Sequence, residues 1–230
     1  MILDQSENNK RIAKNTLLLY FRMFFTMAVT LYTSRVILKA LGVEDFGIYN
    51  VVAGIVTLFS FFSGALSSAA SRFISFELGS NNTSYLSKVF SAIFIIHLLF
   101  SVVVVCFAET IGLWVVNCKL TIPPERIFAA HVVYQFSVFS CIVGIMQIPL
   151  NAMIIAHERL GIYAYMSICE VIGKLSIAFV VTYCSFDHLI VYGMLLFSLV
   201  VILFVIYFIY CRRWCRFLSL VRLVIGCHFY

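Results

Sequence analysis

The sequence predicts an all-α protein, a polytopic membrane helix bundle of about six transmembrane helices. Residues 46–70 and 189–211 contain no charged side chain. Each stretch is as long as the roughly 20 residues that a helix needs to cross ~30 Å of hydrocarbon. The composition agrees, because 63% of residues are hydrophobic, 11% are charged and the mean hydropathy is +1.06. These values exclude an ordinary soluble domain.

Six apolar stretches follow one another along the chain, and we expect each to form one membrane-spanning helix. They cover approximately residues 12–41, 46–70, 89–116, 127–156, 161–183 and 189–211. Residues 72–88 are polar and are expected to connect the second and third spans, partly as helix. The chain is thus divided into a cytoplasmic amino-terminal segment (1–11), a transmembrane bundle (12–211) and a basic tail (212–230).

The fourth span contains a proline with an amide side chain on either side. Pro149 lies between Gln147 and Asn151, and a proline inside a helix kinks it and frees a backbone carbonyl. These three residues are therefore expected to line a cavity or to form a hinge. Ordinary interhelical hydrogen bonding by the two amides is the alternative. The fifth and sixth spans are separated by residues 185–188 alone, which predicts a tight helical hairpin.

Basic residues near the span ends are unequally divided between the two sides of the membrane. One side holds Lys10, Arg11, Lys14, Arg72, Lys88, Arg159, Arg212, Arg213, Arg216 and Arg222, and the other holds Arg35, Lys39, Lys119 and Arg126. Because the richer side faces the cytoplasm, both termini are expected there. Orientation explains these charges, so we expect membrane lipids and no nucleic acid among the partners.

Arginines inside or beside the spans are candidates for binding an anion. Arg22 lies about 12 Å of helix beyond Lys14, so its guanidinium must reach headgroups, a counter-ion or water. In a water-filled cavity, its planar and permanently charged donor fork would suit a phosphate or diphosphate. Snorkelling to the headgroups is the alternative for Arg22, and interfacial anchoring is the alternative for Arg35.

The fifth span holds two opposite charges at i, i+4. Glu170 precedes Lys174, which is the favoured order for an ion pair on one helical face. The pair is expected either to make insertion tolerable or to belong to a conformational or ion-coupling site, since ionisable groups inside a membrane tend to mark pathways.

Motifs for catalysis are missing from the sequence. His157 and Glu158 lack the second histidine of a zinc-protease motif, and neither a Gly-x-Ser-x-Gly elbow nor a phosphate-cradling glycine loop occurs. We therefore expect no enzyme activity, no cofactor and no metal site.

Several strings resemble the amino-terminal half of polysaccharide-unit flippases in the multidrug, oligosaccharidyl-lipid and polysaccharide exporter superfamily. The most specific is the Leu-Gly-x-x-x-Phe-Gly-x-Tyr pattern at residues 41–49, in which Gly42 and Gly47 would permit a sharp external turn. Further similar strings occupy residues 9–16, 108–114, 122–126 and 154–158. The resemblance covers nearly everything up to Tyr210.

This resemblance implies a transport function. Such flippases move an undecaprenyl-diphosphate-linked oligosaccharide across the bacterial inner membrane for lipopolysaccharide or other surface polysaccharide biosynthesis, by alternating access between two lobes. They line a central cavity with basic residues, and the positions here that fit are Arg22, Arg35 and Arg72. The spans of this chain correspond to one lobe, so a second six-span lobe or subunit is an expected partner.

Two other functions remain open at this stage. A drug or cation antiporter lobe would need carboxylates in its spans, and Glu170 is the one acid well inside a span. Alternatively, the chain is a non-transporting membrane fragment or a half-size subunit that pairs through the small residues of segment 64–71. The pattern of residues 214–230 no longer resembles a span and suggests a change of reading frame.

Overall fold

The computed structural model describes residues 2–58, 60–79 and 83–214, and these residues form an all-α bundle. The helices are α1 (Ile2–Thr57), α2 (Ser60–Gly79), α3 (Thr83–Phe107), α4 (Leu113–Cys118), α5 (Ile127–Ala156), α6 (Leu160–Thr182) and α7 (His188–Trp214). A π-helical turn, Ala108–Gly112, joins α3 to α4, and a 3-10 turn, Pro124–Arg126, leads into α5. The predicted fold class is confirmed, and no strand occurs in the described ranges.

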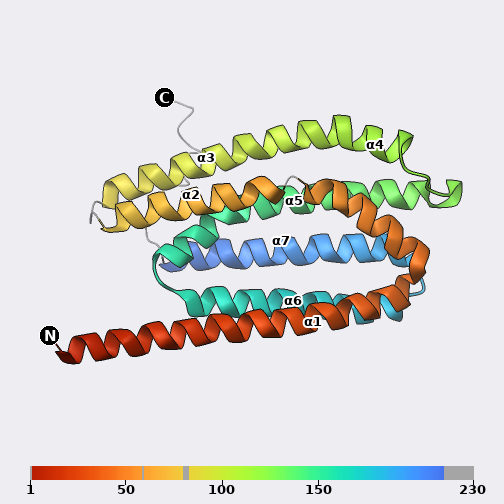
Figure 1. The fold of residues 1–230 in the computed structure, drawn as a ribbon. Coiled ribbons are helices and arrows are strands. Elements are labelled where there is room, and N and C mark those ends of the chain that lie inside the picture. The colour runs from red at the N-terminus through yellow and green to blue at the C-terminus, as the bar shows by residue number, and fades with distance from the viewer. Residues whose placement is uncertain (1, 59, 80–82, 215–230) are drawn as a thin grey trace.

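Helix α1 bends sharply at Gly42 and doubles back (Figure 1). Gly42 has φ 77° and ψ 173°, a combination that glycine adopts because it has no Cβ. Gly47 does not take part in the bend, because Gly42 is the one described glycine with positive φ and Gly47 lies within helix. We call residues 2–41 the first arm of α1 and residues 43–57 its second arm.

The described helices pass along the bundle six times. The second arm continues into α2 after a break at Leu58, whose amide still bonds to the Gly54 carbonyl at 3.3 Å. Helix α2 then extends to Gly79, so most of segment 72–88 is helix belonging to the second and third passes. Burial explains this difference from the predicted connection, because Ala70 and Ile74 on α2 are at most 2% exposed.

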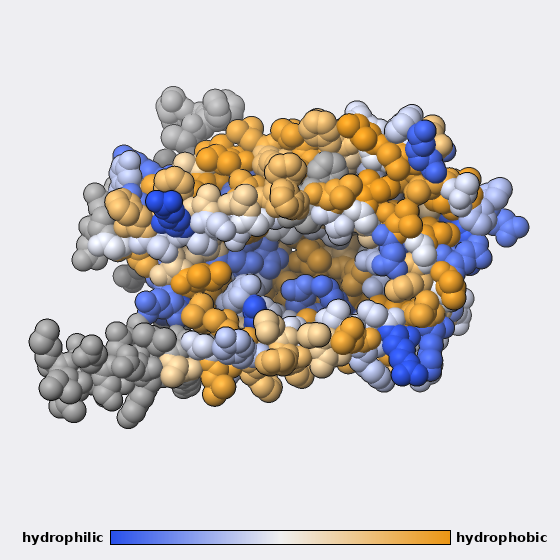
Figure 2. Space-filling model, viewed as in Figure 1, coloured by the Kyte–Doolittle hydropathy of each residue, from blue (hydrophilic) through white to orange (hydrophobic). Residues whose placement is uncertain are grey.

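Five described stretches are long and apolar enough to cross a membrane. One of them, Thr16–Thr57, has 42 residues and includes both arms of α1. As a straight helix it would measure about 63 Å, twice the ~30 Å core of a bilayer, so the bend at Gly42 returns the chain into the bundle. Large apolar side chains cover much of the outer surface (Figure 2), as on the first arm, where Phe21, Phe24 and Leu31 are 63–65% exposed.

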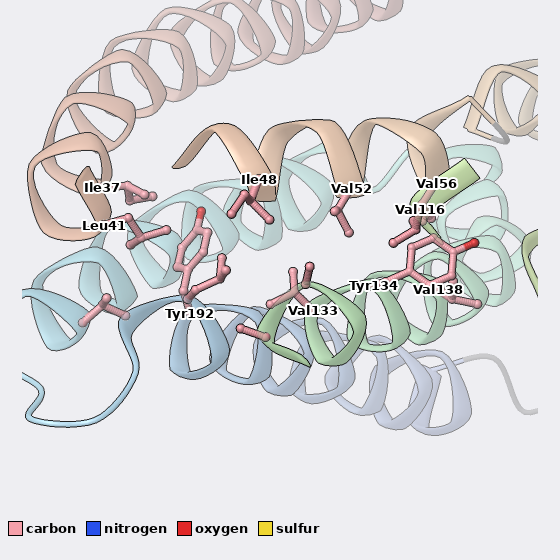
Figure 3. Packing of buried hydrophobic residues seen from close by; sticks show 14 of the residues in the cluster. Ile37, Leu41, Ile48, Val52, Val56, Val116, Val133, Tyr134, Val138 and Tyr192 are labelled. Carbon is pink, nitrogen blue, oxygen red and sulfur yellow. The ribbon is translucent and has the colours of Figure 1, made fainter. Parts of the chain in front are cut away.

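Two buried clusters hold the bundle together. The larger one joins the two arms of α1 to the π-helical turn, α4, α5, α6 and α7. Ten of its residues are labelled in Figure 3: Ile37, Leu41, Ile48, Val52, Val56, Val116, Val133, Tyr134, Val138 and Tyr192. The second cluster lies between α2, α3, α5 and α7 and includes Ile74, Phe90, Leu150 and Tyr207. Helix α5 contributes to both and is the central element.

The first turns of α1, the α5–α6 connection and the end of α7 lie at one end of the bundle (Figure 1). The bend at Gly42 and the α6–α7 connection lie at the other end. This arrangement places the beginning of α1 and the end of α7 on the same side, as an even number of passes requires.

Candidate functional site

A cavity of ≈ 410 Å³ lies between the second arm of α1, α2, α5, α6 and α7. Figure 2 shows a hollow between the layer with the first arm and α6 and the layer with α2 and α3, with hydrophilic residues inside it. Apolar residues of α5 and α7 form part of the cavity wall. Its polar lining includes Thr57, Ser63, Ser137, Ser140, Glu170 and Lys174. A largely apolar hollow that contains a few polar side chains and an ion pair is the leading candidate for a functional site.

The predicted ion pair on α6 forms inside this cavity. Lys174 Nζ lies 2.7 Å from Glu170 Oε1, and the two side chains are 43% and 39% exposed. At this exposure, an i, i+4 pair contributes only about 0.3–0.5 kcal/mol. In this arrangement Glu170 and Lys174 neutralise each other.

Arg22 turns toward α6. Its Nη1 donates a hydrogen bond to Ser167 Oγ at 3.2 Å, and its guanidinium carbon lies 4.7 Å from the centre of the Tyr163 ring. The Arg22 Nε atom is buried and has no hydrogen-bond partner among the residues that the structure describes. A buried N–H without an acceptor costs about 1–3 kcal/mol, so this arginine retains an unused donor inside the bundle.

One face of α6 connects Arg22 to the cavity. Tyr163, Ser167, Glu170 and Lys174 follow one another at intervals of four, three and four residues, which places them on one side of a helix. We call these four residues the α6 polar stripe. Arg22 contacts its first half and the cavity contains its second half. Tyr207 of α7 is buried, and it lies close enough to Arg22 and Glu170 to interact electrostatically with both.

In the sequence, Arg22 and the Glu170–Lys174 pair are separate features. The spacing of Tyr163 and Ser167 relative to the ion pair could have predicted that these four residues share one face of α6. Nothing in the local sequence indicates that the first arm lies against this face of α6.

The other two candidate arginines do not join Arg22 in one contact site. Arg35 is exposed, and it lies 13 positions after Arg22, about 20 Å along the helix axis and about 140° around it. Arg72 is exposed on α2 beside Ser68 and Phe73. Their roles in binding stay predictions, and Arg22 is the candidate that the structure brings next to the polar stripe.

The residues around Pro149 lie within a helix that continues to Ala156 and bends toward that end (Figure 1). Pro149 is buried, Gln147 is half-buried, and the Asn151 Oδ1 atom is buried without a hydrogen-bond partner. Within the described part of the chain, none of the three lines the cavity, whose α5 wall includes Gly144 and Ile145. A hinge role for Gln147, Pro149 and Asn151 stays a prediction.

Comparison with known protein families, with curated proteins and with solved structures finds no match to this chain. The fold and the apolar surface define a multi-pass helical membrane protein. Its distinguishing feature is the cavity with the α6 polar stripe.

Proposed function

We propose that this chain is the amino-terminal lobe of a flippase that moves an undecaprenyl-diphosphate-linked oligosaccharide across the bacterial inner membrane for surface polysaccharide biosynthesis. The observation that carries the proposal is the inward position of Arg22, which contacts Ser167 and Tyr163 and keeps a buried Nε without an acceptor. The motifs that resemble such flippases provide independent support.

The chemistry of Arg22 suits a diphosphate. A guanidinium stays charged at every physiological pH and presents several N–H donors in one plane. Phosphate oxygens accept such donors in pairs, and charge-assisted bonds of this kind are about twice as strong as neutral ones. In this proposal the diphosphate occupies the unused donors of Arg22, while Arg35 and Arg72 provide positive charge farther along the path.

A second lobe completes the transporter in this proposal. The hollow in Figure 2 is open toward the viewer between the first arm and α2, and both hydrophilic and apolar residues lie inside it. A second six-span lobe or subunit would cover this opening. Both termini then face the cytoplasm, in keeping with the distribution of lysine and arginine.

A cation or drug antiporter is less compatible with the cavity. Glu170 is the acidic residue of its lining, and Lys174 neutralises it at 2.7 Å. A half-size subunit without transport activity of its own is favoured by one observation. Gly64, Ala65, Ser68 and Ala69 of α2 are exposed small residues, which suit close contact with another helix.

Binding of undecaprenyl diphosphate to the full chain in lipid nanodiscs tests the proposal. We expect tighter binding of the diphosphate than of undecaprenyl monophosphate, measured by native mass spectrometry. Replacing one charged donor site should remove about 1.5–3 kcal/mol, so Arg22→Gln should weaken diphosphate binding about tenfold or more. The matched control is Arg213→Gln, which alters an exposed arginine at the end of α7.

Equal diphosphate affinity for the wild type and Arg22→Gln would remove Arg22 from the site. Binding of tetraphenylphosphonium that depends on Glu170, together with no binding of the diphosphate, would favour the antiporter. Failure of both ligands to bind, combined with cross-linking of copies through position 68, would favour the half-size subunit.

A further inference from the structure

Three segments meet at the bend end of the bundle through one arginine. Arg126, in the 3-10 turn before α5, lies 3.2 Å from Asp45 Oδ2 through Nη2 and 2.7 Å from Asp187 Oδ2 through Nη1. Asp45 follows the bend in α1, and Asp187 lies in the α6–α7 connection. We call Asp45, Arg126 and Asp187 the clasp. Two carboxylates share one guanidinium, so one negative charge is left over.

Both carboxylate oxygens of Asp187 accept hydrogen bonds. Its Oδ1 accepts hydrogen bonds from the backbone amides of Leu189 at 3.0 Å and Ile190 at 3.5 Å, in the first turn of α7. Amides at the beginning of a helix have no intrahelical acceptor, and the helix dipole favours a negative charge there. The 2.7 Å contact with Arg126 adds to this stabilisation.

Asp45 has a much less favourable environment for a negative charge. It is 6% exposed, and its contact with Arg126 is the longer of the two. In the described part of the chain, its buried Oδ1 has no hydrogen-bond partner. Asp45 follows the bend at Gly42 and lies between the two expected spans, residues 12–41 and 46–70. Burial raises the pKa of the Asp45 carboxyl; Arg126 and His188 oppose this shift, and the negative charges of Asp187 and Glu44 add to it.

We infer that Asp45 is a proton-binding site and that its proton stabilises the closed clasp. A carboxyl that leaves water when the clasp closes binds its proton more tightly in the closed form than in an open form that exposes it. By linkage, acid therefore favours closure and ionisation of Asp45 favours opening. Once Asp45 is protonated, the opposite charges of Arg126 and Asp187 balance each other. The buried Asp45 Oδ1 then belongs to a neutral carboxyl group, which costs less to bury than a carboxylate.

This inference does not depend on the identity of the transported molecule. It gives the bundle a proton-sensitive contact between α1, the start of α5 and the start of α7, at the end opposite Arg212 and Arg213. A membrane protein with such a contact can link the opening of one end to the proton concentration on that side.

Dipolar coupling between two spin labels tests the inference in the full chain in nanodiscs. Amino acids that carry the label would replace Val43, which is 81% exposed, and Thr121, which is exposed before the 3-10 turn. We expect the closely coupled population to be larger at about pH 5 than at about pH 8, a window above the ordinary carboxyl pKa of about 4. Asp45→Asn should keep the closed population at both pH values, whereas the control Glu44→Gln should retain the pH response.

A larger closed population at the higher pH would overturn the inference, because the ion pair with Arg126 would then be what holds the clasp. An unchanged pH response in Asp45→Asn would overturn it as well. Asp45→Ser supplies a second test if Asp45→Asn does not fold. A serine carries no titratable carboxyl, so the closed population should lose its pH response, and a retained response contradicts the inference.

Discussion

Gly112→Ala probes the closest contact between the third pass and α5. Tyr134 of α5 is fully buried, and its hydroxyl donates a 2.7 Å hydrogen bond to the Ala108 carbonyl in the π-helical turn. A Cβ at position 112 would overlap the Tyr134 hydroxyl and lie 3.0 Å from the ring carbon that bears it. The alanine variant can fold only if the ring moves and gives up this hydrogen bond.

The size of the effect follows from three contributions. Leaving the buried hydroxyl and carbonyl unpaired costs about 1–3 kcal/mol, and forcing an extra methyl into a packed interior costs about 1–3 kcal/mol. Exchanging glycine for alanine in a helix returns about 1 kcal/mol. We expect Gly112→Ala to lower the free energy of unfolding by about 1–5 kcal/mol.

SDS-induced unfolding in mixed micelles, followed by circular dichroism, measures this change. Gly54→Ala is the matched control, because a Cβ there meets nothing within 4 Å. In a Tyr134→Phe background the hydroxyl is gone, so the additional cost of Gly112→Ala should fall. If Gly112→Ala costs no more than Gly54→Ala, or costs the same in both tyrosine and phenylalanine backgrounds, the proposed contact is refuted.

Three further predictions follow from the packing and charges. Gly173→Ala places a Cβ 2.6 Å from a terminal methyl of Leu199. Because that methyl can move, the SDS assay should show a loss of about 1 kcal/mol in the free energy of unfolding, and adding Leu199→Ala should relieve the overlap. Glu170→Gln should lower stability by only about 0.3–0.5 kcal/mol, and a loss of several times that size would mean that the pair is shielded from water. Asp187→Ala removes the carboxylate that accepts hydrogen bonds from two backbone amides at the start of α7, so it should lower the free energy of unfolding by about 0.5–2 kcal/mol. Asp187→Asn should retain most of this helix cap, and equal losses of stability in the two variants would contradict capping.

The sequence determined the positions of most helices because apolar length is a local property. The fourth predicted span, residues 127–156, coincides with α5, and the fifth and sixth differ from α6 and α7 by at most three residues at either end. The i, i+4 pair of Glu170 and Lys174 was also predictable, because one helix fixes the distance between its own neighbours.

The tertiary structure decided which helical faces meet, and this decided the sites. Segment 72–88 was expected to be a polar connection that is only partly helical, but residues 72–79 continue α2, because Ala70 and Ile74 pack within the second cluster. Arg22 contacts residues about 145 positions later in the chain, and Arg126 bridges two aspartates from distant segments. Hydropathy reports how strongly each helix prefers the membrane, whereas these contacts depend on the rotation and order of helices in the bundle. That is why the spans were predictable from the sequence, while the α6 polar stripe with Arg22 and the clasp were not.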